Sequence, residues 1–212
     1  MAGFVRLEEI ASVRSDHRPE HGGLGPGPFV GRRAELARLR GGVELALEGM
    51  GTCAWIVGEA GSGKTRLARE LASYARLRGV RVRWLGHAQV RATRSTVAPL
   101  AAGAELLIAD GFPDKGSTSV RAVEQLLASA GPRQLVLGTS RPPLDGLATL
   151  LAERRADVLI LAGLETDALA RLLGALSGET PGVDLTAAVA RATGGNPSRV
   201  RAWLEADRAG MS

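Results

Sequence analysis

The sequence predicts an α/β protein in which a doubly wound, five-stranded parallel sheet is followed by a small helical region. Two observations lead to this prediction. Five short apolar runs with the length of buried strands alternate with segments in which apolar residues recur at helical spacing. After Gly163 the apolar runs stop, and only helical patterns follow. Strands that alternate with helices form a parallel sheet, because each helix returns the chain to the edge where the next strand begins.

Residues 1–27 predict a flexible arm, since this segment is polar and becomes rich in glycine and proline. Within it, His17-Arg18-Pro19-Glu20-His21 formally matches a zinc-binding pattern that requires a helix. Pro19 opposes such a helix, so we interpret the stretch as a solvated loop. The first helix follows residue 32, and we expect Gly41-Gly42 to bend or break it. Its inner face would carry Leu36, Leu39, Val43 and Leu47.

A glycine-rich loop lies between the first strand and the next helix. The apolar run Cys53–Val57 leads into Gly58-Glu59-Ala60-Gly61-Ser62-Gly63-Lys64-Thr65, which satisfies G-x-x-x-x-G-K-[ST], and a helix follows as far as Gly79. This order is that of a P-loop, whose backbone N–H groups and helix N-terminus bind phosphate. Lys64 would reach the β- and γ-phosphates, and the Thr65 hydroxyl would ligate Mg²⁺. We therefore predict a P-loop NTPase that binds a nucleoside di- or triphosphate. The phosphate-binding residues would be Gly58, Gly61, Ser62, Gly63, Lys64, Thr65 and Arg66.

The other strands and crossover helices follow in order along the chain. The predicted strands are Val80–Leu85, Glu105–Asp110, Gln134–Gly138 and Asp157–Ala162. Helices are predicted to begin among residues 117–119 and to cover Leu147–Glu153, and the pattern of residues 86–104 is ambiguous.

Asp110 ends the third strand at the sheet edge where the P-loop also lies. A carboxylate in this place can hold Mg²⁺ through water. A carboxylate after a strand is a common pattern in itself, and the P-loop gives it significance. We predict Thr65 and Asp110 as the metal-binding residues.

Helical patterns fill the chain after Gly163. Thr166 can cap the first helix, and a second runs from Asp184 to Thr193 and ends at Gly194-Gly195. Asn196 is a good N-cap and Pro197 a good first residue for the third helix. The predicted organisation is an N-terminal arm over 1–27, a nucleotide-binding domain over 28–163, and a small helical lid over 164–212.

Charge and composition limit the classes of partner and the cellular location that we expect for this protein. The net charge of +5 invites a nucleic-acid interpretation, but Lys64 and Lys115 are the only lysines of the 212 residues and the arginines are scattered. We therefore do not expect nucleic-acid binding through this chain alone. The single cysteine, Cys53, is interpreted as a core thiol. No apolar stretch approaches the ~20 residues of a membrane span, and the first residues lack a signal-peptide core. We expect a cytoplasmic protein without a membrane partner.

With these motifs placed, the chain resembles the STAND branch of AAA+-related P-loop ATPases, and most closely the ATPase module of large LuxR-type bacterial transcriptional regulators. The resemblance covers roughly residues 28–205. It rests on five blocks in the family's order, which are Phe29-Val30-Gly31-Arg32 with Glu35, the Walker A motif Gly58–Thr65, the Walker B motif Leu106–Asp110, Leu137–Pro142 and Gly194-Gly195-Asn196-Pro197.

The resemblance implies ATP or ADP as the nucleotide and gives further residues a role. The backbone of Phe29 and Val30 would bind the adenine edge, and Pro197 would pack near the base and couple the lid to the nucleotide. Arg141 would sense the γ-phosphate, so that Lys64, Asp110 and Arg141 form the catalytic set. Two ordinary alternatives stay open: Arg141 can be a surface arginine after a strand, and Pro197 can simply begin a helix.

Two departures from the family pattern shape the functional hypothesis. Gly111 occupies the position after Asp110 where the family usually carries a second acid, and residues 79–104 are short for the family. We expect an ATP/ADP-binding switch with slow Mg²⁺-dependent hydrolysis, whose nucleotide state is read by a protein partner or by self-association. The alternatives are an ATPase proper and a DNA-binding AAA+-like regulator. Arg154 or Arg155 can also act as an arginine finger in a neighbouring copy.

Overall fold

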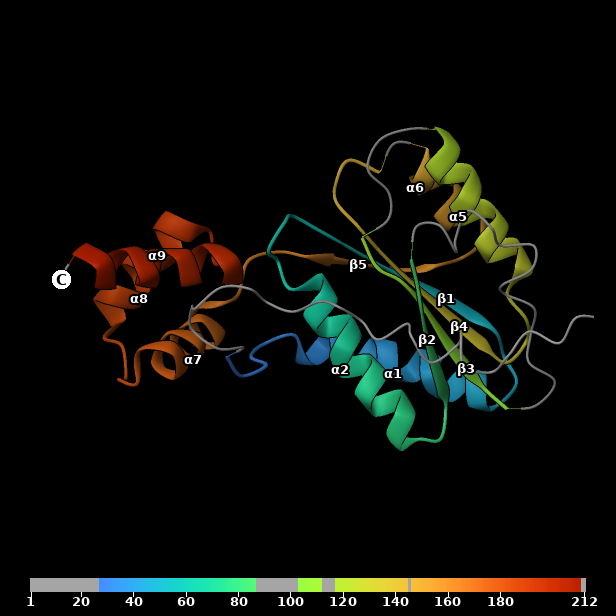
Figure 1. The fold of residues 1–212 in the computed structure, drawn as a ribbon, viewed down its shortest axis with the longest axis horizontal. Coiled ribbons are helices and arrows are strands. Elements are labelled where there is room, and N and C mark those ends of the chain that lie inside the picture. Colours follow the sequence, from blue (N-terminus) through green and yellow to red (C-terminus); the bar gives the residue numbers. More distant parts are fainter. Residues whose placement is uncertain (1–26, 87–102, 112–116, 145, 211–212) are drawn as a thin grey trace, which may run out of the picture.

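Five parallel strands form one sheet in the order β2-β3-β4-β1-β5. The computed structural model describes residues 27–86, 103–111, 117–144 and 146–210, and Figure 1 shows its fold. The strands are β1 (Thr52–Gly58), β2 (Arg81–Leu85), β3 (Glu105–Ala109), β4 (Gln134–Ser140) and β5 (Asp157–Leu161). Every pairing between neighbouring strands is parallel. The predicted five-stranded parallel sheet is confirmed, and each strand lies close to its predicted range.

Helices cover both faces of this sheet. The helices α1 (Arg33–Leu47) and α2 (Lys64–Leu77) lie on one face, and α5 (Ser117–Ser129) and α6 (Leu147–Glu153) lie on the other (Figure 1). In β1, Ala54 and Ile56 pack in the core beneath α1 and α2, whereas Trp55 and Val57 pack in the core beneath α5 and α6. Side chains of a strand alternate between faces, so a strand buried on both sides is a continuous apolar run. The doubly wound arrangement is confirmed.

Three helices follow β5, and Figure 1 places them beyond its end, apart from the helices that cover the sheet. They are α7 (Thr166–Ser177), α8 (Val183–Thr193) and α9 (Pro197–Gly210). They share a core of their own, to which Leu169, Leu173, Val189 and Val200 contribute. This core explains why their apolar residues recur at helical spacing.

The two predicted caps of this helical region have different outcomes. The N-cap of α7 is Glu165, whose side chain makes no capping hydrogen bond, so the prediction that Thr166 caps the helix is wrong. Glu165 has the extended backbone of a cap, whereas Thr166 is already helical. The α9 cap is confirmed, because Asn196 Oδ1 accepts the N–H groups of Ser198 at 3.1 Å and Arg199 at 3.4 Å.

Gly41-Gly42 does not interrupt α1, which is continuous from Arg33 to Leu47, so the expected bend or break is wrong. Packing explains the difference. A Cβ at Gly42 would lie 3.3 Å from both methyl carbons of Leu135, at the start of β4. Glycine here lets the helix approach the sheet closely, and this packing outweighs its poor helix propensity of about 1 kcal/mol.

Gly138 in β4 leaves the space that the Trp55 ring occupies. Trp55 is fully buried on β1 and lies opposite Gly138 in the parallel register. A Cβ at position 138 would lie 2.1 Å from Trp55 Cζ3, far inside van der Waals contact. The indole Nε1–H donates to Ser140 Oγ at 3.0 Å, which satisfies a buried donor. These contacts fix the end of β4.

Cys53 is partly buried and packs against the core beneath α5 and α6, close to its predicted place as a core thiol. Burial raises the pKa of the Cys53 thiol to about 12, with a small opposing effect of the Arg154 charge. Because the thiolate is the reactive form, a shift of this size lowers its population about 10³-fold at neutral pH. We expect a disulfide reagent to label the native protein at pH 8 about 10³-fold more slowly than the protein unfolded in guanidinium. Equal labelling rates in the two states would contradict this placement of Cys53.

Some expectations fall outside the described residues. The N-terminal arm with its His17–His21 pattern lies there, as does most of the ambiguous segment 86–104. Among the helices that the structure describes, none combines the length and the apolar character that crossing a membrane would take.

Candidate functional site

The phosphate loop connects β1 to α2 at the carboxyl edge of the sheet. Gly58 ends β1, and α2 begins at Lys64 directly after Gly63. Gly61 and Gly63 have φ angles of 78° and 97°, a left-handed conformation that glycine adopts without a steric penalty. The loop thus turns sharply enough to leave the first N–H groups of α2 free for a ligand, as an anion site at a helix N-terminus requires.

A cavity of about 420 Å³ lies against this loop, and its described lining comes from four separate stretches of the chain, within residues 27–32, 61–69, 164–172 and 197–201. Nine of the predicted site residues line it, namely Phe29, Val30, Gly61, Ser62, Gly63, Lys64, Thr65, Arg66 and Pro197. The structure therefore brings together the proposed adenine-binding residues, the phosphate loop and the start of α9. Gly58 lies beneath the loop, where a Cβ would come within 2.6 Å of Ser62 Oγ. The size is that of a small-molecule site.

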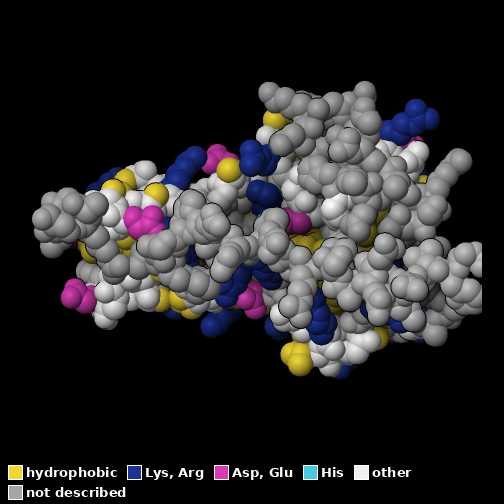
Figure 2. Space-filling model, viewed as in Figure 1, with side chains coloured by type: hydrophobic (Ala, Val, Ile, Leu, Met, Phe, Trp, Pro, Cys, Tyr) yellow, Lys and Arg dark blue, Asp and Glu magenta, His cyan; other side chains and the backbone are white. Residues whose placement is uncertain are grey.

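The charges around the cavity favour an anion. Its described lining includes five cationic residues and no carboxylate, the cations being Arg32, Lys64, Arg66, Arg69 and Arg201. Figure 2 shows Lys and Arg side chains gathered in the middle of the visible face, where the region of α7–α9 meets the sheet region. A cavity with one sign of charge raises the local concentration of a ligand of the opposite sign.

Lys64 is held by its own loop. Its Nζ donates to the carbonyl oxygens of Gly58 and Glu59, both at 2.8 Å. Burial lowers the pKa of the Lys64 ammonium, the positive charge of Arg141 lowers it further, and Asp110 acts in the opposite direction. A phosphate group beside Lys64 would offset both the burial and the repulsion from Arg141. The exposed Arg141 thus lies near enough to the loop to act on it electrostatically, as expected from its place after β4.

Asp110 is held between two threonine hydroxyl groups. Thr65 Oγ1 donates to Asp110 Oδ2 at 2.8 Å, and Thr139 Oγ1 donates to Asp110 Oδ1 at 2.7 Å. Thr139 Oγ1 in turn accepts the N–H of Gly111 at 2.8 Å. The two predicted metal-binding residues are therefore in direct contact. Thr139 is a site residue that the sequence analysis did not single out, although it lies in the Leu137–Pro142 block.

The donor groups fit Mg²⁺ bound together with a nucleotide. The described residues contain no group of three His, Cys, Asp or Glu side chains that would enclose a metal. Mg²⁺ typically takes only one or two protein oxygens and completes its shell with phosphate and water, which the pair Thr65 and Asp110 matches. The Ser62 hydroxyl is buried in the loop and makes no hydrogen bond with the described protein. A buried polar group without a partner is costly, and a ligand can satisfy it.

Arg32 is a second residue of the site whose role the sequence did not reveal. Its side chain is 10% exposed and lines the cavity. It donates to Glu35 Oε1 at 3.1 Å and to the carbonyl oxygen of Ala162, which precedes the connection to α7. Arg32 therefore holds the Phe29–Val30 segment against the link between the sheet and the helical region. The sequence feature that could have pointed to Arg32 is the Phe29-Val30-Gly31-Arg32 block, of which it is the last residue.

Arg154 and Arg155 lie at the other edge of the sheet. They line a separate cleft of about 910 Å³ together with Thr52, at the start of β1, and Leu135, near the start of β4. In a parallel sheet this edge is opposite to the one that carries the phosphate loop. Within one chain these arginines are thus not part of the nucleotide cavity.

Comparison with known families decides the classification. Residues 28–183 match the family model of the AAA ATPase domain. The chain belongs to this family. The phosphate loop, Asp110 and Phe29–Val30 all fall within the match. The STAND and LuxR-type assignment is finer than this match and stays a prediction.

Solved structures share the fold of this AAA ATPase domain. A chain of the E. coli MS115-1 HORMA:CdnC:Trip13 complex is 18% identical with a TM-score of 0.59, over 78% of this chain and 74% of that one. The Aeropyrum pernix ORC1 protein in complex with DNA is 19% identical with a TM-score of 0.59. That match covers 82% of this chain and 58% of the ORC1 chain. No curated protein matches the sequence. At these identities the likeness concerns the fold.

Proposed function

We propose that this AAA ATPase domain is a STAND-type switch, in which ATP or ADP bound with Mg²⁺ sets the position of the α7–α9 lid. The observation that carries the proposal is the composition of the cavity wall. The phosphate loop forms one side, and Leu172, Pro197 and Ser198 of the helical region form another. A ligand that contacts both regions stabilises one arrangement of them over others, and ATP and ADP differ in the contacts they can make.

Each residue of the site has a role in this proposal. Lys64 would exchange its contacts with Gly58 and Glu59 for the β- and γ-phosphates, and the N–H groups at the start of α2 would bind the same phosphates. Thr65 and Asp110 would hold Mg²⁺, which neutralises phosphate charge when bound. Thr139 would keep Asp110 oriented, because it donates to the oxygen that Thr65 does not contact. Arg141 would add positive charge beside the γ-phosphate.

Slow hydrolysis is part of the proposal. Asp110 is engaged by two hydroxyl groups and assigned to the metal, so it is poorly placed to orient a water molecule. Gly111 follows it with a φ of 75° and has no side chain to do so. Glu59, in the loop, forms an exposed ion pair with Arg199 at 3.0 Å. Among the described residues near Asp110, the structure thus offers no acid in the usual position of a general base.

The switch is tested by amide exchange. We expect Mg-ATP to slow exchange at residues 194–205, in addition to the phosphate loop, because Pro197 and Ser198 line the same cavity. Exchange in α5, on the far face of the sheet, should stay unchanged and serves as the internal control. Protection confined to residues 28–141 would mean that the helical region does not respond to the nucleotide.

A partner would read the lid position. We propose a protein partner or a second copy of the chain, and the placement of Arg154 and Arg155 supports the second copy as a candidate. At the edge opposite the phosphate loop, they can reach a phosphate only in a neighbouring molecule. DNA, which the ORC1 structure contains, is less supported, because Asp and Glu side chains lie among the cations of the visible face (Figure 2).

A further inference from the structure

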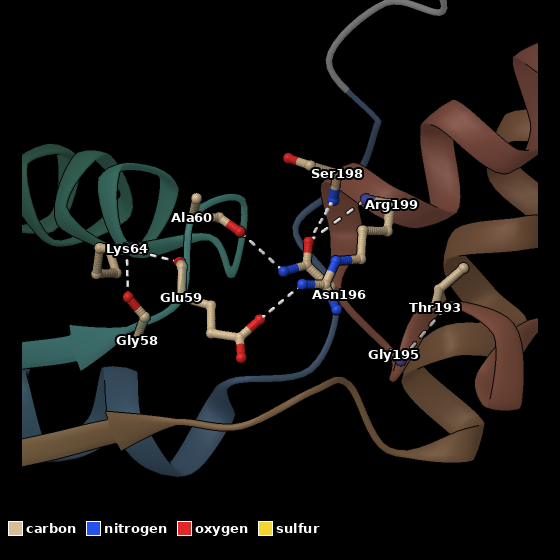
Figure 3. A network of polar contacts seen from close by, with 9 residues as sticks. All are labelled: Gly58, Glu59, Ala60, Lys64, Thr193, Gly195, Asn196, Ser198 and Arg199. Carbon is tan, nitrogen blue, oxygen red and sulfur yellow. Dashed lines mark hydrogen bonds and ion pairs between the residues drawn. The ribbon is translucent and has the colours of Figure 1, made fainter. Parts of the chain in front are cut away.

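The start of α9 is bonded directly to the phosphate loop, as Figure 3 shows. Asn196 Nδ2 donates to the carbonyl oxygen of Ala60 at 2.9 Å, and the Ser198 N–H donates to the carbonyl oxygen of Gly61 at 3.4 Å. On the outside, Arg199 Nη2 donates to Glu59 Oε2 at 3.0 Å. Three consecutive residues of the loop are thus bonded to the N-cap residue and the first turn of α9.

Asn196 uses both ends of its amide at once. Its Oδ1 accepts the N–H groups of Ser198 and Arg199 and so caps α9, while its Nδ2 binds the loop. The residue is 5% exposed, so these bonds are shielded from water. Among the good N-cap residues, asparagine is the one that also carries a strong side-chain N–H donor, since aspartate only accepts and serine has a single short hydroxyl.

The absence of a side chain at Gly61 allows α9 to approach the phosphate loop. A Cβ at position 61 would lie 2.5 Å from Ser198 Cβ and 2.8 Å from Asn196 Oδ1. The G-x-x-x-x-G-K-[ST] pattern itself requires glycine only at positions 58 and 63. The absence of a side chain at Gly61 therefore serves the approach of α9, as well as its φ of 78°.

We propose that Asn196 is a positioning residue that couples the lid to phosphate binding. Its bond fixes the carbonyl of Ala60, and because the peptide group is planar and trans, it also directs the Gly61 N–H away from α9. Gly61 lines the nucleotide cavity, so the loop is prepared for phosphate by a residue of the lid. The coupling is reciprocal: whatever orders the loop also stabilises the start of α9. This inference rests on the nucleotide binding at the phosphate loop that the proposed function includes.

The test compares Asn196→Ser with Arg199→Ala in the whole chain, with Mg-ADP as the probe. Serine keeps the cap and adds no charge, but it cannot reach Ala60. We expect calorimetry to show ADP binding roughly three- to tenfold weaker, the usual effect of one lost hydrogen bond. The nucleotide-induced protection of residues 196–205 should fall by a similar factor. Arg199→Ala removes only the exposed Glu59 pair and should change both readouts less than twofold.

The outcomes separate this inference from the switch itself. Wild-type affinity and wild-type protection in Asn196→Ser would overturn the coupling role and leave the switch standing. Lid protection absent from the wild type, together with weaker ADP binding by Asn196→Ser, would refute the switch and keep the positioning role. If the serine variant fails to fold, Asn196→Asp preserves the volume and the cap. It should weaken ADP binding by at least as much, because its carboxylate faces the Ala60 carbonyl, and unchanged binding would again overturn the inference.

Discussion

Replacing Lys64 with alanine is expected to weaken Mg-ATP binding about 10- to 100-fold, the range for hydrogen bonds to charged groups. The substitution removes the mobile cation at the start of α2, which now rests on the carbonyl oxygens of Gly58 and Glu59. Because burial and Arg141 lower the pKa of Lys64, the phosphate contact also relieves unfavourable charge in the free protein. Calorimetric titration with Mg-ATP measures the effect.

A matched control lies on the same helix. Arg76 is an exposed cation in the last turn of α2, far from the phosphate loop. Arg76→Ala removes the same formal charge from the same helix and should leave the affinity within about twofold, since exposed charges are screened over a Debye length of about 8–10 Å. Unchanged affinity in Lys64→Ala would remove the basis for placing phosphate at this loop.

The second large effect is on turnover. We expect wild-type ATP hydrolysis at about 10⁻³–10⁻¹ s⁻¹, which is 10²–10⁴-fold below a median enzyme, because no general base follows Asp110. Affinity should be unaffected, since ground-state contacts to the phosphates do not involve position 111. Steady-state phosphate release under saturating Mg-ATP gives the rate. Turnover of about 1 s⁻¹ or more would favour an ATPase proper over a switch that uses slow hydrolysis as a timer.

Variants at Gly111 test the cause of the slow rate. The Gly111 φ of 75° is left-handed, a conformation that aspartate tolerates better than glutamate or alanine. A Cβ there meets no atom of the described protein within 4 Å, so space is available. We expect Gly111→Asp to raise turnover more than Gly111→Glu, and Gly111→Ala, which adds strain without a carboxylate, to raise it not at all. Equal rates in all three would show that the missing acid is not the cause.

Most of the fold was predictable because its signals are local. Buried parallel strands such as Leu135–Leu137 are continuous apolar runs, and the helices between them carry one apolar face. The phosphate loop was predictable because its chemistry fixes both residue types and spacing. The prediction of a bend at Gly41-Gly42 was wrong because the local propensity of glycine opposes a helix. The close approach of Gly42 to Leu135, which favours the continuous helix, is a tertiary contact that the sequence does not display.

The site was only partly predictable for the same reason. Thr65 followed from the spacing of the phosphate-loop motif and Asp110 from its place at the end of a buried strand, and the structure places them in contact. The bonds of Thr139 to Asp110 and of Asn196 to Ala60 join residues 29 and 136 positions apart, and one polar residue gives no periodic signal. Asn196 was correctly predicted as a cap, and its second partner became visible only once α9 was placed against the loop.

The close fit of Trp55 against Gly138 restricts how this sequence can diverge. A residue larger than glycine at 138 is accommodated only after the indole at 55 has become smaller, because its Cβ would overlap the ring. A smaller residue at 55 first leaves a cavity, at a cost of about 3–5 kcal/mol, and deprives the Ser140 hydroxyl of its donor. Thr139, which donates to Asp110, lies on β4 between Gly138 and Ser140, both of which contact Trp55. A change at Gly138 therefore has to pass through an unstable intermediate or alter both strands at once, and we expect this to slow sequence change beside the sheet edge that carries the phosphate loop.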